Sequence, residues 1–152
     1  MKLIIGNDHA GIELKKEIVA HLHEQGYIVN DVGVDTGERS DYPVIAKKVA
    51  AAISDHEYDL GILICGTGIG MSIAANKFPG VRAAAASDGF SVRLTRQHNN
   101  ANILCLGQWD VGVKRALELV DLFVSTPFDG VNTRHQKRLD LITEIENQIK
   151  GV

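Results

Sequence analysis

The segment that decides the fold is Gly61-Ile62-Leu63-Ile64-Cys65-Gly66-Thr67-Gly68-Ile69-Gly70. Its first five residues form an apolar run, which is typical of a strand that is covered on both faces. A turn with three glycines follows, and residues 69–77 then have the pattern of a helix. A buried strand that leads through a short turn into a helix indicates an α/β fold with a parallel sheet.

The same alternation continues along the whole chain. Further strands are predicted at residues 3–5, 28–29, 81–85 and 102–106, and further helices at residues 12–25, 42–53, 90–98, 113–124 and 135–150. Five strands separated by helices predict a five-stranded α/β sandwich, in a single domain that spans residues 1–152. No strand follows the last helix, which therefore either covers the sheet or reaches a partner subunit.

Composition narrows the range of functions. The chain is 45% hydrophobic and 23% charged, and its net charge of −3 argues against binding to a nucleic-acid backbone. No apolar run approaches the roughly 20 residues that span a bilayer. The N-terminal segment lacks the apolar core of a signal peptide, so we expect a cytoplasmic protein. The two cysteines lie in strand-like runs and are interpreted as thiols rather than as a disulfide framework.

Ligands of such folds bind where strands end and helices begin, and three polar or glycine-rich segments stand out: residues 6–11, 65–70 and 96–100. The alternate glycines Gly66, Gly68 and Gly70 let the backbone approach a ligand and direct several N–H groups at one negative charge. That charge can belong to a phosphate, a carboxylate or an enediolate. The alternative is a tight turn whose glycines only provide room for packing. The spacing matches neither a dinucleotide-binding motif nor a P-loop.

Cys65 ends the strand and begins this turn. The amide groups at a helix start stabilise a thiolate, so Cys65 is a candidate base or nucleophile. The alternative is an inert buried thiol, which is the interpretation we give to Cys105. The hydroxyl of Thr67 either polarises a substrate oxygen or holds the turn.

Two histidines, His9 and His98, are candidate site residues. Asp8 is expected to cap the first helix, and the adjacent His9 is either a proton-transferring or phosphate-binding group or a solvated side chain. Residues 97–100 place four hydrogen-bonding side chains before a buried strand, where polarity is costly unless it has partners. His98 is therefore predicted to be a site residue.

The last helix begins with a cluster of cations. Arg134 and Arg138 are four residues apart, so they share a helix face and can hold a phosphate together; a solvated helix face is the alternative. No group of ligating residues has the spacing of a structural zinc site, so we expect no metal.

Taken together, these motifs closely resemble the type B ribose-5-phosphate isomerases and the related galactose-6-phosphate isomerase subunits over nearly the whole chain. The segments that carry the resemblance are Asp8-His9-Ala10-Gly11, Asp41-Tyr42-Pro43, residues 65–70 with Ile73-Ala74-Ala75-Asn76-Lys77, residues 96–102, and Arg134-His135-Gln136-Lys137-Arg138. The resemblance implies a Rossmann-like sandwich that forms dimers, or dimers of dimers, through the C-terminal helix, with active sites between two subunits and no cofactor.

The resemblance also implies roles for single residues. Cys65 matches the base that moves a proton between C1 and C2, and Thr67 matches the hydroxyl that shifts a proton between the two oxygens. The backbone of residues 66–70 would hold the enediolate. The remaining matches are His98 from a neighbouring subunit as ring opener with Asp8 assisting, Asn99 and Tyr42 on sugar hydroxyls, and His9, Arg134 and Arg138 on the phosphate.

The chain departs from the family pattern at two places. Trp109 stands where the family usually has a phosphate-binding arginine, and the turn from Gly130 to Arg134 is longer by two residues. Both changes fall at the expected phosphate end. The resemblance implies an aldose-ketose isomerase that converts ribose 5-phosphate to ribulose 5-phosphate. The two departures suggest an alternative, in which the proton-transfer chemistry is kept while the distal specificity shifts toward a hexose phosphate such as allose 6-phosphate or galactose 6-phosphate, or toward an unphosphorylated sugar.

Three other functions compete with an isomerase. A nucleotide-dependent oxidoreductase is suggested by the glycine turn and by Asp88 about 20 residues later, although the glycine spacing is wrong. A receiver-like signalling module would need an aspartate where Cys65 stands. A sugar-binding regulator without activity would keep the same pocket.

Overall fold

The computed structural model describes residues 1–130 and 132–151, and it confirms the predicted parallel sheet. The strands run in the order β2-β1-β3-β5-β4, and every neighbouring pair is parallel. Their bounds are Lys2–Asn7 for β1, Ile28–Asp31 for β2, Leu60–Cys65 for β3, Ala83–Ala85 for β4 and Ile103–Gly107 for β5.

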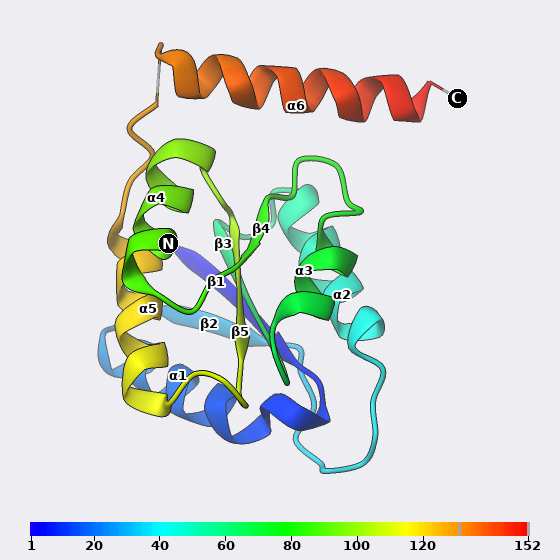
Figure 1. Ribbon diagram of the computed structural model, residues 1–152. Helices are drawn as coiled ribbons and strands as arrows, with labels where there is room; N and C mark the ends of the chain where they lie inside the picture. The colour runs from blue at the N-terminus through cyan, green and yellow to red at the C-terminus, as the bar shows by residue number, and fades with distance from the viewer. Residues whose placement is uncertain (131, 152) are drawn as a thin grey trace.

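Helices cover both faces of this sheet, which gives the three layers of a Rossmann-like sandwich (Figure 1). One layer contains α1 (Ile12–Glu24), α4 (Gly89–Asn99) and α5 (Val113–Ser125), and the other contains α2 (Tyr42–Ser54) and α3 (Ile69–Ala75). A short 3-10 helix, η1 (His9–Gly11), precedes α1. Each predicted helix is present, and its ends differ from the prediction by at most two residues.

Alternation along the strands divides the core between the two layers. Ile62, Ile64, Leu104 and Leu106 belong to the cluster on the α1 side. Leu63, Cys65, Ile103 and Cys105 belong to the cluster on the α2 side. Because side chains point to opposite faces at every second position, both faces of β3 and β5 are buried, as their uninterrupted apolar sequence requires.

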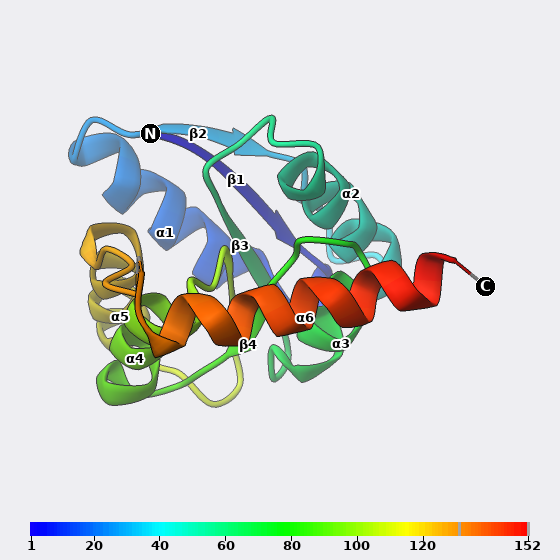
Figure 2. The ribbon, with the colours of Figure 1, turned by 90° about the horizontal axis from the view of Figure 1, so that it is seen from above.

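The last helix, α6 (Arg134–Lys150), lies outside both layers and passes over β4 on the side of the amino ends of the strands (Figure 2). Its N-terminal end stacks His135 on His98 of α4, with ring centroids 4.2 Å apart, and near its C-terminal end Glu146 accepts a hydrogen bond from the Gly80 amide. None of the helices in the described part of the chain is both long and apolar enough to cross a membrane.

Candidate active site

Sheet topology places a crevice at the carboxyl ends of β1 and β3. The chain leaves β1 toward β2 on one side and returns to β3 on the other, and such a reversal is where open α/β sheets bind ligands. A pocket of about 220 Å³ lies there. Its lining residues come from four segments of the chain: Asp8, His9, Ala10, Tyr42, Cys65, Gly66, Thr67, Gly70 and Trp109.

The Cys65 side chain lies at the boundary between the core and this pocket. Only 6% of the residue is exposed, and it packs within the cluster on the α2 side of the sheet. Cys65 is also one of the residues that line the pocket, and its sulfur accepts a hydrogen bond from the Gly68 amide at 3.2 Å. The thiol is thus bonded to the glycine turn at the side of the core where the pocket begins.

Cys105 is more deeply buried than Cys65, although it also lines a neighbouring pocket of about 180 Å³. It is 1% exposed in the middle of β5, and burial, with a smaller contribution from the nearby Cys65, raises the pKa of the Cys105 thiol. The interpretation of Cys105 as an inert core residue agrees with this environment.

The glycine turn is packed against three neighbours. A Cβ at Gly66 would stand 2.4 Å from the Trp109 ring, and a Cβ at Gly70 would stand 2.9 Å from the Tyr42 ring. Gly68 has a φ of +76°, and a Cβ there would lie 2.9 Å from a backbone oxygen of β5. Packing therefore accounts for these glycines, and the same packing brings two aromatic rings to the pocket.

Asp8 and His9 enter the pocket from the turn after β1. The Asp8 amide donates to the Ile64 carbonyl, so this turn lies directly beside the end of β3. The Asp8 carboxylate accepts from the Ala10 amide at 2.9 Å. It therefore caps η1, whereas Gly11 is the N-cap of α1 without a side-chain bond. The prediction that Asp8 caps the first long helix was wrong by this one turn.

Ser40 positions the His9 ring, and sequence reasoning missed it. The Ser40 hydroxyl accepts from the His9 amide at 3.0 Å, and Nδ1 of His9 lies 3.2 Å from both the amide nitrogen and the carbonyl oxygen of Ser40. Either tautomer is thus held through Nδ1, which leaves Nε2 to meet a ligand. In the sequence, only its position next to Asp41-Tyr42 could have pointed to Ser40 as a site residue. No local pattern connects Ser40 with His9.

A buried lysine fixes the loop that carries Ser40 and Tyr42. Lys15 of α1 donates to the Val34 carbonyl and pairs with Asp31 and Asp35. Burial of the ammonium lowers its pKa, but the hydrogen bonds and charges of the two aspartates outweigh this effect, so the pKa of Lys15 is raised. The Lys15 hydrogen bond and charge in turn lower the pKa of Asp35. Lys15 therefore remains charged and ties the loop to α1.

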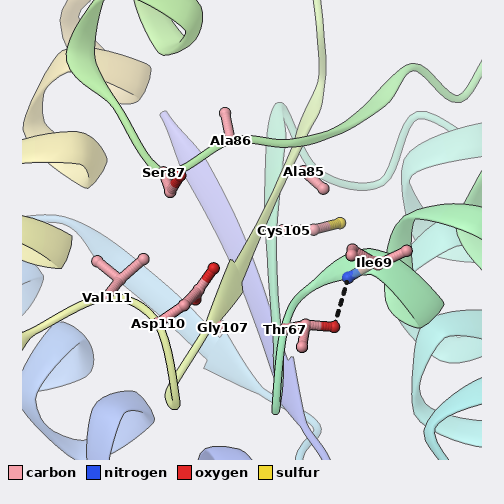
Figure 3. Close-up of a pocket in the computed structure, with 9 residues that line it drawn as sticks. All are labelled: Thr67, Ile69, Ala85, Ala86, Ser87, Cys105, Gly107, Asp110 and Val111. Atoms are coloured by element: carbon pink, nitrogen blue, oxygen red, sulfur yellow. Dashed lines mark hydrogen bonds between the residues drawn. The ribbon is translucent and has the colours of Figure 1, made fainter.

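A second, smaller pocket of about 180 Å³ lies beside the glycine turn, between Thr67 and Ile69 on one side and Ser87 and Asp110 on the other (Figure 3). The two pockets share Thr67, whose hydroxyl accepts from the Ile69 amide. Ser87 and Asp110 contribute polar groups from the turns after β4 and β5. Of these two pockets, only the first brings Cys65, Asp8 and His9 together.

Four predicted site residues lie elsewhere in the chain. His98 and Asn99 form the last turn of α4, and Arg134 and Arg138 begin α6. Segment 96–100 thus precedes the amino end of β5, whereas Cys65 pairs with Gly107 at its carboxyl end, about 13 Å further along the strand. We expected this segment to lie with the ligand site at the carboxyl ends of the strands. Within one chain this expectation was wrong, because the segment lies at their amino ends. Val131 of the lengthened turn lies outside the described residues.

Two other side chains have structural roles. Asp88 caps α4 by accepting from the Ser91 amide at 2.8 Å, and this hydrogen bond lowers the pKa of Asp88. A cap explains Asp88 without a nucleotide. Gln108, which sequence reasoning also missed, accepts from the Leu14 amide and ties the turn after β5 to the start of α1.

Known proteins resemble this chain over nearly its whole length. Residues 3–142 match the family model described as Ribose/Galactose Isomerase. Ribose-5-phosphate isomerase B of Escherichia coli is 49% identical over 147 residues, which cover 97% of each chain. Ribose-5-phosphate isomerase B of Clostridium thermocellum has a TM-score of 0.95 at 48% identity, covering 98% of this chain and 99% of that one. The Mycoplasma genitalium enzyme, solved with bound ribulose-5-phosphate, has a TM-score of 0.91 at 41% identity over 96% of each chain. The chain belongs to the Ribose/Galactose Isomerase family.

Proposed function

We propose that this protein is an aldose-ketose isomerase that converts ribose 5-phosphate to ribulose 5-phosphate in the cytoplasm, with Cys65 as the base. The observation that carries the proposal is that Cys65 lines one pocket with Asp8 and His9, while its sulfur accepts a hydrogen bond from an amide of the glycine turn. The names of the similar proteins support the substrate. Each subunit is assigned a single sugar-phosphate isomerase domain, residues 1–152.

The proposed reaction moves a proton along the carbon chain. The Cys65 thiolate removes the proton from C2 of the open-chain aldose, which leaves a negatively charged enediolate, and then returns a proton to C1. Amide groups of the 66–70 turn stabilise the enediolate oxygen, and Thr67 transfers a proton between the oxygens on C1 and C2. No cofactor is required, because the substrate is oxidised at C2 and reduced at C1 within one molecule.

The remaining roles require a second subunit. We assign ring opening to His98 assisted by Asp8, contacts with sugar hydroxyls to Tyr42 and Asn99, and phosphate binding to His9, Arg134 and Arg138. In one chain, Cys65 lies at the carboxyl ends of the strands, whereas the other end of the sheet carries His98, Asn99 and the two arginines. They complete the pocket only if a partner subunit contributes them. We therefore propose a homodimer, alone or paired into a dimer of dimers, with shared active sites.

Exposed apolar side chains support this association. Ile145 and Ile149 of α6 are 56% and 69% exposed, and Ile73 of α3 and Phe90 of α4 are also exposed. Apolar surface of this kind near both halves of the divided site favours burial against a second copy of the chain.

A substrate panel tests the proposed activity. Wild type, Cys65→Ala and the matched control Cys105→Ala are assayed with ribose 5-phosphate, allose 6-phosphate, galactose 6-phosphate and free ribose. We expect turnover of ribose 5-phosphate by wild type and by Cys105→Ala, and a loss of about 10²–10⁴-fold or more in Cys65→Ala. If wild type isomerises none of these sugars, the proposal is wrong.

Mixing two inactive variants tests the shared site. In a dimer that pairs Cys65→Ala with His98→Ala, one of the two sites contains both native side chains if His98 crosses the interface. Random exchange of subunits then restores about a quarter of the wild-type activity, since half of the dimers are mixed and each has one intact site. If His98 acts in its own chain, every site lacks one group and mixing restores nothing.

A further inference from the structure

Trp109 is the one tryptophan of the chain, and it lines the pocket that contains Cys65. It remains 75% exposed, more than any other large apolar side chain in the described residues except Ile28. Leaving so much aromatic surface in water forgoes a large hydrophobic stabilisation. An exposed ring in a pocket is instead suited to cover a ligand.

The backbone holds Trp109 in this position. The Trp109 amide donates to the Gly66 carbonyl at 3.0 Å, and the Gln108 amide donates to the Cys65 carbonyl at 2.9 Å. The six-membered part of the indole lies against Gly66, where a Cβ would stand 2.4 Å from Cζ3 and 2.5 Å from Cε3. The ring is thus fixed beside the two residues that carry the proposed base and the first turn amide.

The surroundings of the ring favour an uncharged ligand group. The turn from Gly107 to Gly112 contains no cation, and the residue after Trp109 is the exposed Asp110, which lines the adjoining pocket. A phosphate beside Asp110 would be repelled, whereas the C–H groups of a sugar pack well on an aromatic face and its hydroxyls can donate to a carboxylate.

We infer that Trp109 is a specificity-determining residue whose indole packs on the uncharged carbon chain of the sugar phosphate. This inference rests on the proposed function and deepens it, because it fixes the orientation of the substrate. The phosphate lies away from the Trp109-Asp110 turn, toward His9. This side of the pocket recognises the substrate through contact with its carbon chain rather than through its charge.

Tryptophan fluorescence, excited at the long-wavelength edge where tyrosine does not absorb, tests the inference directly, because Trp109 is the one tryptophan of the chain. Cys65→Ala protein is titrated with ribose 5-phosphate, with inorganic phosphate and with free ribose, while calorimetry measures binding independently. Ribose 5-phosphate should cover the exposed indole and shift its emission saturably to shorter wavelength. Phosphate should leave the emission unchanged at concentrations where calorimetry shows it bound.

The outcomes separate the inference from the proposed function. If ribose 5-phosphate binds by calorimetry without changing the emission, or if phosphate alone shifts it, the inference is overturned while the isomerase proposal stands. If calorimetry detects no sugar phosphate and wild type turns none over, both are overturned.

Substitutions provide a kinetic readout. Trp109→Ala should raise KM for ribose 5-phosphate about tenfold with kcat within about twofold, since an aromatic contact binds substrate and transition state alike. Trp109→Phe, which keeps an aromatic face, should stay within about threefold of wild type in KM. A fall in kcat with KM unchanged in Trp109→Ala would contradict a role in substrate recognition.

Discussion

Gly68→Ala perturbs the position where the glycine turn is most constrained. Gly68 has a φ of +76°, and an added Cβ would lie 2.9 Å from the Cys105 carbonyl oxygen and 3.0 Å from the carbonyl carbons of Cys105 and Leu106. These are backbone atoms of the central strand β5, which cannot move without disturbing its pairing with β3 and β4.

Two penalties therefore add. Holding a residue with a Cβ in the left-handed region costs about 1–2 kcal/mol. Forcing the Cβ against the strand costs about 1–3 kcal/mol more, as overpacking of a core does. We expect Gly68→Ala to lower the free energy of unfolding by about 3 kcal/mol, which in a chain of this size lowers the melting temperature by about 6–12 °C.

Two other glycines provide matched controls. Gly80 has a φ of +73° but open space around its Cβ position, so Gly80→Ala carries only the torsional penalty. Gly37 has neither constraint, and Gly37→Ala should leave stability unchanged or raise it slightly. Urea unfolding at one protein concentration ranks the three variants, because association would otherwise shift the midpoints.

The reasoning is refuted if Gly68→Ala is no less stable than Gly80→Ala, since the close approach to β5 would then cost nothing. It is equally refuted if Gly37→Ala loses as much stability as either, because a general loss from adding a methyl group would explain all three results.

Two further predictions concern titratable groups. Asp35→Asn should be less stable than wild type at neutral pH: Lys15 lowers the Asp35 pKa below its ordinary 3.8, so the stabilisation exists above that value and disappears as pH falls through the folded pKa. Urea unfolding at neutral pH and at about pH 3 should therefore show a larger difference at neutral pH than at the acidic pH. Iodoacetamide at mildly alkaline pH should alkylate Cys65 and leave Cys105 unmodified until the protein unfolds, because burial keeps the Cys105 thiol protonated and covered. Peptide mass spectrometry distinguishes the two cysteines. Labelling of Cys105 in the native protein would contradict its buried position.

The fold was predictable because its strands are apolar at nearly every position. Residues 61–65 and 102–106 could be assigned as central strands, and they are β3 and β5, buried on both faces. The position of the glycine turn and its cysteine could be predicted as well. A parallel sheet brings the carboxyl ends of β1 and β3 together, so the turn after β3 had to lie beside the turn after β1.

Other parts of the site depend on contacts that local sequence does not encode. Ser40 meets His9 across 31 positions and Gln108 meets the Leu14 amide across 94, so neither pairing leaves a spacing to detect. The glycine pattern was also ambiguous, because a turn that cradles an anion and a turn that makes room for Trp109 and Tyr42 both require residues without a Cβ. The close approach of Trp109 and Tyr42 to the turn can be seen only in the folded structure.

Isomerisation of ribose 5-phosphate in D2O tests most directly whether the Cys65 sulfur moves a proton. A thiol exchanges its proton with solvent, so ribulose 5-phosphate made by wild type or by Cys105→Ala should contain deuterium at C1, and folded Cys65→Ala should form no product at a comparable rate. Product without deuterium, or a Cys65→Ala rate close to that of wild type, would contradict the assignment of Cys65 as the base.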